Sequence, residues 1–309
     1  MEIFKKLSSL KKIPYTVPIV ILCSLLLLII FHQRPQTKAV KYDYTRNTST
    51  LASKVRFTLP LFITLTPPMP TNPPVENVKN SEDAKRIPIL YYHYIEVNPD
   101  PKDTLRSSLA VVPSVFDGQM NYLSTNGFTG MTLDDMAAVF DGKATLPPKP
   151  IILTFDDGYA DFYANAYPIL SKYHLKATLF IITRLVGRRN YLTWDQIKDM
   201  QKSGLIFFGA HTQTHPSLPR LSGKRLEDEI LGSKIDLESE LGIPVNWFAY
   251  PYGGFSDAVV TEVEKAGFVG ALTTLQGGWH TRNNFYLLRR IRVGGLSPVS
   301  FANYINSGR

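Results

Sequence analysis

Residues 151–159 read Ile151-Ile152-Leu153-Thr154-Phe155-Asp156-Asp157-Gly158-Tyr159. The first five are apolar or β-branched, which is typical of a buried strand. Two carboxylates and a glycine follow at once. An Asp-Gly pair after a strand also suits a hairpin turn. However, residues 162–173 have a helical pattern and not that of a second strand. We therefore expect a strand that delivers Asp156 and Asp157 to one point.

A pair of histidines lies downstream in His211-Thr212-Gln213-Thr214-His215. Their spacing of four would put both rings on one face of a helical turn. One Asp and two His form a common ligand set for a divalent metal with an open position. The same set suits a non-haem iron oxygenase, although those enzymes usually have a double-stranded β-helix fold.

From residue 87 onward, strand and helix patterns alternate. This alternation, over about 220 residues, predicts a parallel sheet, and the number of units suggests closure into a barrel. Several polar side chains then fall at the carboxyl end of a predicted strand, which is the edge that carries the active site of a βα barrel. They are His93, Asp156, Asp157, His211 and Tyr252.

Composition limits the class of protein. The chain has 309 residues, a net charge of +8 and 44% hydrophobic residues, as expected for a globular domain with additional segments. No dense basic helix or nucleic-acid recognition motif accompanies the positive charge, so we expect anionic envelope polymers or lipid headgroups near the protein and no nucleic acid. Cys23 is the only cysteine, which excludes an internal disulfide and a cysteine-based metal site.

The N-terminal region predicts membrane attachment. Four lysines within residues 1–12 precede an uncharged apolar run at 13–31, which is near the length of a membrane-spanning helix. We interpret residues 13–31 as an uncleaved signal anchor, with the N-terminus in the cytoplasm and the rest outside. A cleaved signal peptide, which would give a secreted protein, is the alternative.

Residues 32–86 are rich in Pro and Thr and are predicted to form an extracytoplasmic linker. Within this segment, residues 55–66 alternate between apolar and other side chains, which also suits an edge strand docked on the domain. Residues 87–309 are the predicted catalytic domain.

Three segments together resemble the polysaccharide deacetylases of carbohydrate esterase family 4. Residues 154–158 (Thr-Phe-Asp-Asp-Gly) are similar to the first family motif, residues 211–215 to the second, and residues 250–253 (Tyr-Pro-Tyr-Gly) to the third. The resemblance covers the chain from about residue 87 to the C-terminus. It implies a distorted (β/α)7-type barrel, a divalent metal, and hydrolysis of N-acetyl groups on amino sugars.

The resemblance also implies roles for individual residues. Asp157, His211 and His215 are expected to bind the metal, with zinc as the favoured ion and cobalt, nickel, manganese or iron as alternatives. Asp156 is expected to act as general base. The backbone N–H of Tyr252 is expected to stabilise the oxyanion.

Two departures from the family pattern affect these roles. Ala249 occupies the position of the usual arginine partner of the base, and Arg290 is the candidate replacement. The usual late Leu-x-His motif is absent, and His280 does not match its context. Leu90-Tyr91-Tyr92-His93 instead resembles the poly-N-acetylglucosamine deacetylase subgroup, which implies that His93 is the general acid.

The sequence therefore predicts a metal-dependent deacetylase that acts on N-acetylglucosamine units of an envelope or extracellular polysaccharide. An O-acetyl esterase acting on a glycan such as acetyl-xylan, or a non-catalytic glycan-binding relative, is the alternative. No protein partner can be deduced.

Overall fold

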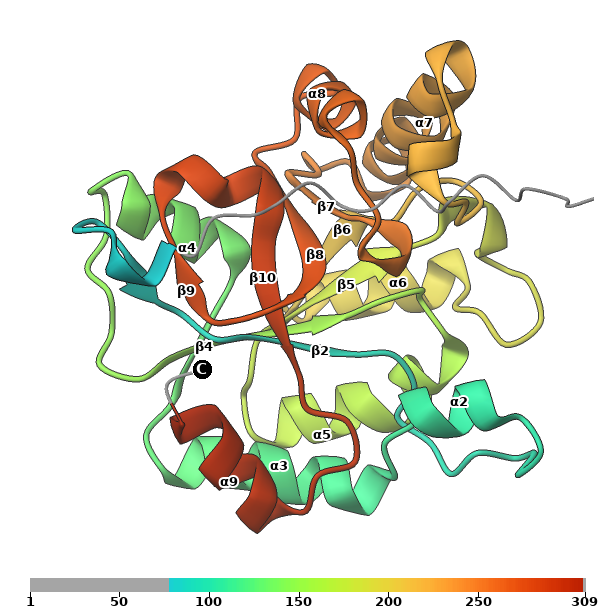
Figure 1. The fold of residues 1–309 in the computed structure, drawn as a ribbon. Coiled ribbons are helices and arrows are strands. Elements are labelled where there is room, and N and C mark those ends of the chain that lie inside the picture. The colour runs from blue at the N-terminus through green and yellow to red at the C-terminus, as the bar shows by residue number, and fades with distance from the viewer. Residues whose placement is uncertain (1–77, 308–309) are drawn as a thin grey trace, which may run out of the picture. The chain divides into compact units, whose positions relative to one another are not determined.

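The computed structural model describes residues 78–307, and its centre is a barrel of parallel strands (Figure 1). Around the barrel the order is β2, β10, β8, β7, β6, β5 and β4, and β4 pairs with β2 to close the ring. The parallel seven-stranded barrel predicted from sequence is thus confirmed. Its strands are β2 (Ile89–Tyr92), β4 (Pro150–Phe155), β5 (Ala177–Ile181), β6 (Ile206–Ala210), β7 (Trp247–Ala249), β8 (Gly270–Gln276) and β10 (Leu288–Arg292).

Three short strands lie outside this ring. β3 (Thr129–Met131) pairs with the first half of β4. β1 (Lys85–Arg86) and β9 (Trp279–His280) form a separate antiparallel pair just before β2 begins. β9 therefore lies at the amino end of β2, away from the rim where the barrel strands end.

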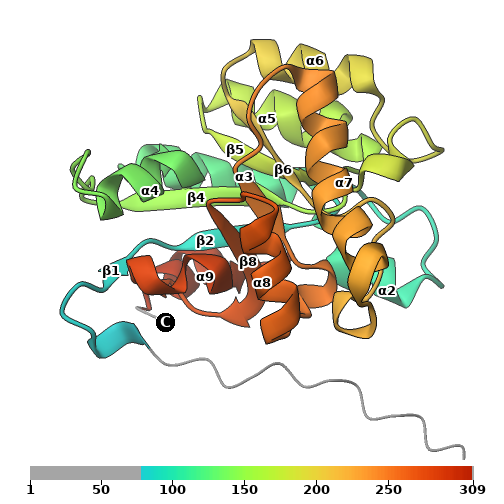
Figure 2. The same cartoon turned by 90° about the horizontal axis from the view of Figure 1, so that it is seen from above.

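Helices surround the barrel (Figures 1 and 2). They are α2 (Thr104–Leu109), α3 (Pro113–Thr125), α4 (Leu133–Phe140), α5 (Tyr167–Lys172), α6 (Trp194–Lys202), α7 (Gly223–Leu241), α8 (Asp257–Lys265) and α9 (Pro298–Asn306). No helix within residues 78–307 has the length and apolar character needed to span a membrane. The predicted anchor at 13–31 and the possible strand at 55–66 lie outside the described residues.

The strand β4 shows why this sequence forms a central strand. All six of its residues are buried, as expected for a parallel strand covered on both faces. Ile151, Leu153 and Phe155 pack into the large apolar cluster with residues of α3 and α5. Ile152, between them, belongs to a second cluster that includes Ile89. The alternation of strand side chains therefore ties β4 to two separate parts of the core.

Local signals fix several helix ends. A capping box is present at Thr193 and Gln196, with each side chain bonded to the other residue's backbone N–H. Gly242 ends α7 in a left-handed conformation, with φ of 66°. The predicted helix over residues 162–173 is divided, because a π-helical turn, Phe162–Ala166, precedes α5.

The strand register places the candidate side chains on one rim. Tyr92 pairs with Phe155, so His93 and Asp156 follow two neighbouring strands at the same level. Ile181 pairs with Ala210, and Ala210 with Phe248, which brings the residues after β6 to the same end of the barrel.

Candidate active site

A sharp turn at the end of β4 separates the two carboxylates. The N–H of Asp156 donates to the carbonyl of Tyr92, which continues the pairing of β4 with β2. Asp157 and Gly158 then both take left-handed backbone conformations with φ of 74°. Glycine adopts this conformation freely, and aspartate tolerates it better than most residues. The chain thereby leaves the sheet within two residues.

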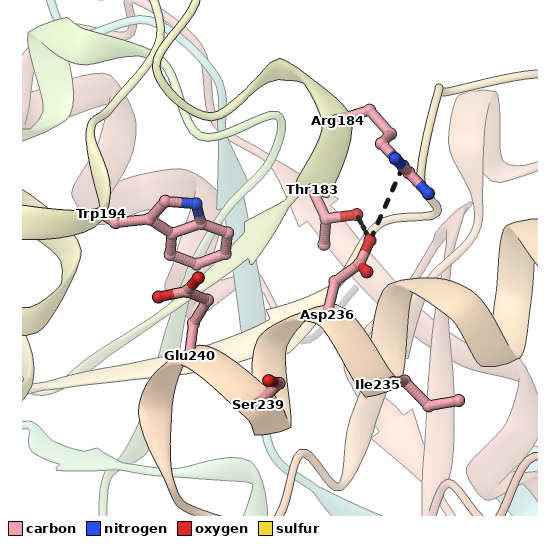
Figure 3. Close-up of a pocket in the computed structure, with 7 residues that line it drawn as sticks. All are labelled: Thr183, Arg184, Trp194, Ile235, Asp236, Ser239 and Glu240. Atoms are coloured by element: carbon pink, nitrogen blue, oxygen red, sulfur yellow. Dashed lines mark hydrogen bonds and ion pairs between the residues drawn. The ribbon is translucent and has the colours of Figure 1, made fainter.

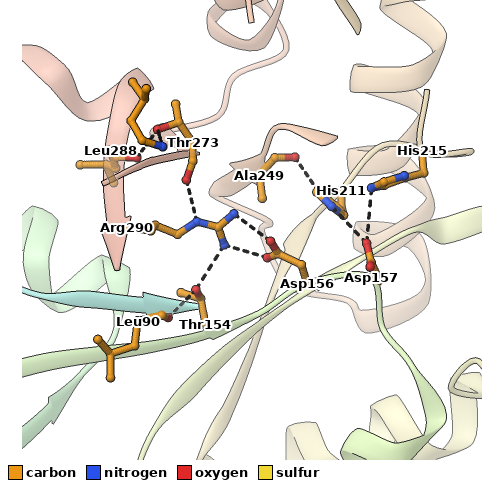
Figure 4. Close-up of polar contacts among 11 residues, drawn as sticks. Leu90, Thr154, Asp156, Asp157, His211, His215, Ala249, Thr273, Leu288 and Arg290 are labelled. Carbon is orange, nitrogen blue, oxygen red and sulfur yellow. Dashed lines mark hydrogen bonds and ion pairs between the residues drawn. The ribbon is translucent and has the colours of Figure 1, made fainter. Parts of the chain in front are cut away.

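Asp157, His211 and His215 converge on one point. Asp157 Oδ1 lies 3.3 Å from His211 Nε2 and 3.4 Å from His215 Nε2 (Figure 4). The ligand atoms of all three residues lie within 4.8 Å of one another. The spacing of the two histidines predicted a helical turn, but the structure has no helical turn there. They flank a loop in which Thr212 and His215 have positive φ, and we call residues 211–215 the histidine loop.

The donor atoms of this triad fit a divalent cation. Asp157 Oδ1 is buried and accepts no hydrogen bond within residues 78–307. His211 Nδ1 lies 2.7 Å from the carbonyl oxygen of Ala249, so Nδ1 carries the proton and Nε2 presents its lone pair. Burial and the neighbouring His211 lower the pKa of His215 to about 4, which keeps this imidazole neutral. Two imidazole lone pairs and one carboxylate oxygen that face one another are donors that divalent transition metals accept.

Electrostatics in the triad favour a positive charge between its members. Although burial raises it, the pKa of Asp157 lies below its usual value, because His211 and other imidazoles surround the carboxylate. Burial lowers the pKa of His211, but Asp157, Asp156 and the carbonyl of Ala249 together raise it above its usual value, which favours a proton shared with Asp157. A metal ion would take the place of that proton between the same two side chains.

Asp156 is paired with Arg290. The guanidinium contacts both carboxylate oxygens, at 2.8 and 2.7 Å, and both side chains are buried (Figure 4). Arg290 Nε donates to the carbonyl of Thr273, Nη1 donates to Thr154 Oγ1, and the ring of Tyr91 lies 4.6 Å from the guanidinium carbon. Although burial raises it, the pKa of Asp156 is held below its usual value by Arg290.

His93 and Tyr252 complete the rim. His93 is half-buried, and burial lowers its pKa, while the nearby charges of Asp156 and Asp157 oppose that shift. Tyr252 has φ of 58° and an exposed side chain whose ring centroid lies 4.5 Å from that of His215. The structure therefore brings together all seven residues selected from the sequence.

Neither His280 nor Trp247 belongs to this site. His280 pairs in register with Lys85, before β2, and its Nε2 lies 3.1 Å from the carbonyl oxygen of Ile87. It is therefore at the opposite end of β2 from His93. Trp247 is buried and donates its indole N–H to Asp134, as a core residue would.

A separate pocket of about 300 Å³ is lined by residues after β5 and on α6 and α7. Trp194, Asp236 and Glu240 project into it (Figure 3). Asp236 also accepts hydrogen bonds from Thr183 and from Gln213 in the histidine loop. Sequence patterns did not identify Asp236, because its hydrogen bonds join α7 to segments that are distant in the sequence.

Comparisons with known proteins agree with this geometry. The family model named "Polysaccharide deacetylase" matches residues 143–271. YxkH of Bacillus subtilis (strain 168), whose name assigns it to the polysaccharide deacetylases, is 32% identical over 231 residues, or 74% of this chain and 79% of that protein. The chain belongs to the polysaccharide deacetylase family.

Other members of the family show the same relationship. The poly-beta-1,6-N-acetyl-D-glucosamine N-deacetylase of Staphylococcus aureus (strain MRSA252) is 31% identical over 197 residues, or 60% of this chain and 68% of that protein. The solved structure of Streptococcus pyogenes deacetylase PplD in complex with acetate has a TM-score of 0.67 and 32% identity, covering 72% of this chain and 99% of that chain. The solved structure of IcaB from Ammonifex degensii has a TM-score of 0.61 and 25% identity, covering 71% of this chain and 95% of that chain.

Family membership assigns the protein to the hydrolases that deacetylate polysaccharides, and the Asp157–His211–His215 triad is a possible metal site within that fold. One departure from the family pattern now has a structural explanation. Ala249 has no side chain that could reach Asp156, and its carbonyl orients His211. The guanidinium comes instead from Arg290 on β10.

Proposed function

We propose that this protein uses a divalent metal to remove N-acetyl groups from N-acetylglucosamine units of an envelope or extracellular polysaccharide. A polymer such as poly-β-1,6-N-acetylglucosamine is the favoured substrate. The observation that carries the proposal is the placement of an arginine-paired buried carboxylate, Asp156, directly beside the Asp157–His211–His215 triad. Similarity to the Staphylococcus aureus deacetylase, whose name gives that substrate, supports it.

The proposed metal is zinc, because one carboxylate oxygen and two imidazole nitrogens leave a position open in its usual four-coordinate geometry. When bound, the ion would polarise the acetyl carbonyl and lower the pKa of a water molecule. Cobalt, nickel, manganese and iron accept similar donors and remain alternatives.

The protein's own residues would then move the protons. Asp156, kept ionised by Arg290, takes a proton from the attacking water as general base. The N–H of Tyr252 donates a hydrogen bond to the oxyanion formed from the acetyl carbonyl. His93 donates a proton to the sugar nitrogen as the carbon–nitrogen bond breaks. One water is consumed, and acetate and a free amine are released.

Acetate release from a panel of glycans tests the substrate. Poly-β-1,6-N-acetylglucosamine should be the best substrate, ahead of chitooligosaccharides and peptidoglycan. Preferred hydrolysis of acetyl-xylan would instead identify an O-acetyl esterase. Absence of acetate release from every glycan by metal-loaded protein would favour a glycan-binding relative.

We also propose that residues 13–31 anchor the protein in the cell membrane, with residues 32–86 as linker and residues 87–309 outside the cytoplasm. The lysines within residues 1–12 and the uncharged apolar run support this orientation. Protease added to intact cells should release a soluble fragment that begins in the linker. Full protection of the domain would contradict the orientation, and a mature form beginning near residue 34 would identify a cleaved signal peptide.

A further inference from the structure

The helix α7 presents an unusual polar face to the histidine loop. Glu229, Gly232 and Asp236 are spaced three and four residues apart, so they follow one face of the helix. Each of them contacts or closely approaches Gln213 in the middle of the loop. We propose that Glu229 is a positioning residue, which holds the histidine loop in the conformation that brings His211 and His215 to the metal. The inference rests on the metal centre proposed above.

Glu229 is a buried carboxylate without a cationic partner in the described part of the chain, and its hydrogen bonds go to the histidine loop. One of its oxygens, Oε2, accepts from the backbone N–H groups of Gln213 and Thr214, at 3.0 and 2.8 Å. The other oxygen, Oε1, accepts from the hydroxyl of Thr214. Three donors from two successive loop residues thus converge on one side chain. Successive N–H groups directed at an anion form a concave binding site, or nest.

The loop needs this support because its backbone is strained. Thr212 and His215 have φ of 66° and 63°, and the left-handed region is especially unfavourable for a β-branched residue such as threonine. Such conformations persist only where surrounding contacts fix them. The two strained residues flank Gln213 and Thr214, whose backbone N–H groups donate hydrogen bonds to Glu229. Glu229 therefore fixes the part of the loop that sets the separation of the two imidazoles.

Other hydrogen bonds also hold the histidine loop. The hydroxyl of Thr212 accepts from the N–H of His215, and the carbonyl of Thr212 accepts from the N–H of Thr183. Asp236 accepts from the side chain of Gln213 at 2.9 Å. It also accepts from the hydroxyl of Thr183 at 2.6 Å (Figure 3). Glu229 differs from these partners because it alone binds the loop backbone between the histidines through a buried charge.

Gly232 explains how the loop comes so close to α7. A Cβ atom at this position would lie 2.7 Å from Gln213 Nε2. Glycine is unfavourable inside a helix, but here it leaves room for the side-chain amide of Gln213, which a larger residue would displace. The sequence contains a weak signal of this face, since Glu229 lies in register with the buried Leu226 and Ser233.

The competing interpretation is that Glu229 only stabilises the fold. The two interpretations predict different metal affinities. Substitution of a residue that orients metal ligands typically lowers metal affinity or activity by about 10- to 100-fold. A purely structural residue would change the thermal stability of the metal-free protein and leave the affinity of the folded protein unaltered. Metal affinity measured on folded protein therefore separates the two.

The test uses Co²⁺ titrations of the full chain, followed by visible absorption, together with thermal unfolding of the metal-free protein. Glu229→Met keeps the side-chain length and removes both acceptors, so it should bind Co²⁺ about 10- to 100-fold more weakly and with an altered spectrum. Glu229→Gln retains an oxygen acceptor and should stay near the wild-type affinity. Asp228→Ala, which removes an exposed neighbouring carboxylate, is the matched control and should bind as the wild type does.

A folded Glu229→Met variant with the wild-type affinity and spectrum would overturn the proposal. If that variant does not fold, Thr214→Val provides the test from the loop side, because Thr214 is exposed and loses only its bond to Glu229. It should bind Co²⁺ several-fold more weakly, and unchanged affinity would overturn the proposal. Co²⁺ binding is measured without substrate, so a wild-type protein that binds Co²⁺ but releases no acetate would contradict the proposed function and leave this inference intact.

Discussion

Arg290 donates one hydrogen bond to each carboxylate oxygen of Asp156, although the two residues are 134 positions apart in the sequence. Strand β10 delivers the arginine and strand β4 delivers the acid, and both strands pair with β2. The pair keeps a buried carboxylate ionised beside the Asp157–His211–His215 triad. The structure thus supplies a proton acceptor where the proposed reaction needs one.

Replacement of Arg290 should affect both stability and pH dependence. Arg290→Met leaves Asp156 buried without its partner, which we expect to cost about 3–5 kcal/mol of unfolding free energy. Because Arg290 holds the pKa of Asp156 below its usual value, its loss should raise that pKa. The acid limb of the kcat/KM profile should therefore move to higher pH.

Two further variants control that experiment. Arg292→Ala removes an exposed arginine from the same strand and should leave the pH profile unchanged. The double variant Arg290→Met with Asp156→Asn should be more stable than Arg290→Met alone, since no unpaired charge remains. Equal instability of the single and double variants would show that the ion pair is not the cause.

The two adjacent carboxylates should behave differently when each is neutralised. Asp156→Asn should retain bound metal and lose turnover, because Asp156 is the proposed base. His215→Ala should lose metal and activity together, because it removes one of three ligands. Metal content and acetate release measured on the same samples check both. A metal-free Asp156→Asn protein beside a metal-containing Asp157→Asn protein would show that the two roles are reversed.

His93→Ala tests the proposed general acid. An amine leaves poorly unless it is protonated, so we expect kcat on the N-acetyl substrate to fall on the order of a hundredfold or more. An activated ester, whose leaving group needs no proton, should show a much smaller defect. The variant should keep its metal and its melting temperature. Equal losses on both substrates, or no loss on either, would remove His93 from the mechanism.

His280 should influence the pH dependence of stability and have no role in catalysis. Burial lowers its folded-state pKa to about 4, below the value of about 6.5 expected in the unfolded chain. Its contribution is therefore present above pH 6.5 and is lost as the pH falls toward 4. The loss should amount to about 3 kcal/mol at 1.36 kcal/mol per unit of pKa.

Denaturant unfolding of His280→Gln at several pH values checks this prediction. The stability of the variant should fall less than that of the wild type between pH 7 and pH 4, while its acetate release at neutral pH should remain. His174→Gln, which replaces an exposed histidine, is the control. Parallel curves for wild type and His280→Gln would show that His280 is not the titrating group.

The strand that leads to the active site could be predicted from the sequence, because its apolar pattern is local. The apolar run before Asp156 predicts a buried strand, and this prediction is confirmed. The barrel itself follows from the alternation of strand and helix patterns. The placement of His93 and Asp156 at one level follows from parallel strands that end in register.

Other features depend on contacts between distant segments, and the sequence could not reveal them. A spacing of four predicted a helical turn for His211 and His215, but they lie on a loop in which Thr212 and His215 have positive φ and which forms hydrogen bonds with Thr183 and Glu229. The contact of Arg290 with Asp156 joins residues 134 positions apart, on β10 and β4.

Acetate release before and after metal removal tests the central claim most directly. The full chain is incubated with poly-β-1,6-N-acetylglucosamine oligomers as purified, after treatment with a chelator, and after addition of Zn²⁺. We expect the chelator to abolish acetate release, Zn²⁺ to restore it, and His215→Ala to remain inactive under all three conditions. Undiminished acetate release by protein shown to contain no metal, or a wild-type rate for His215→Ala, would contradict the account.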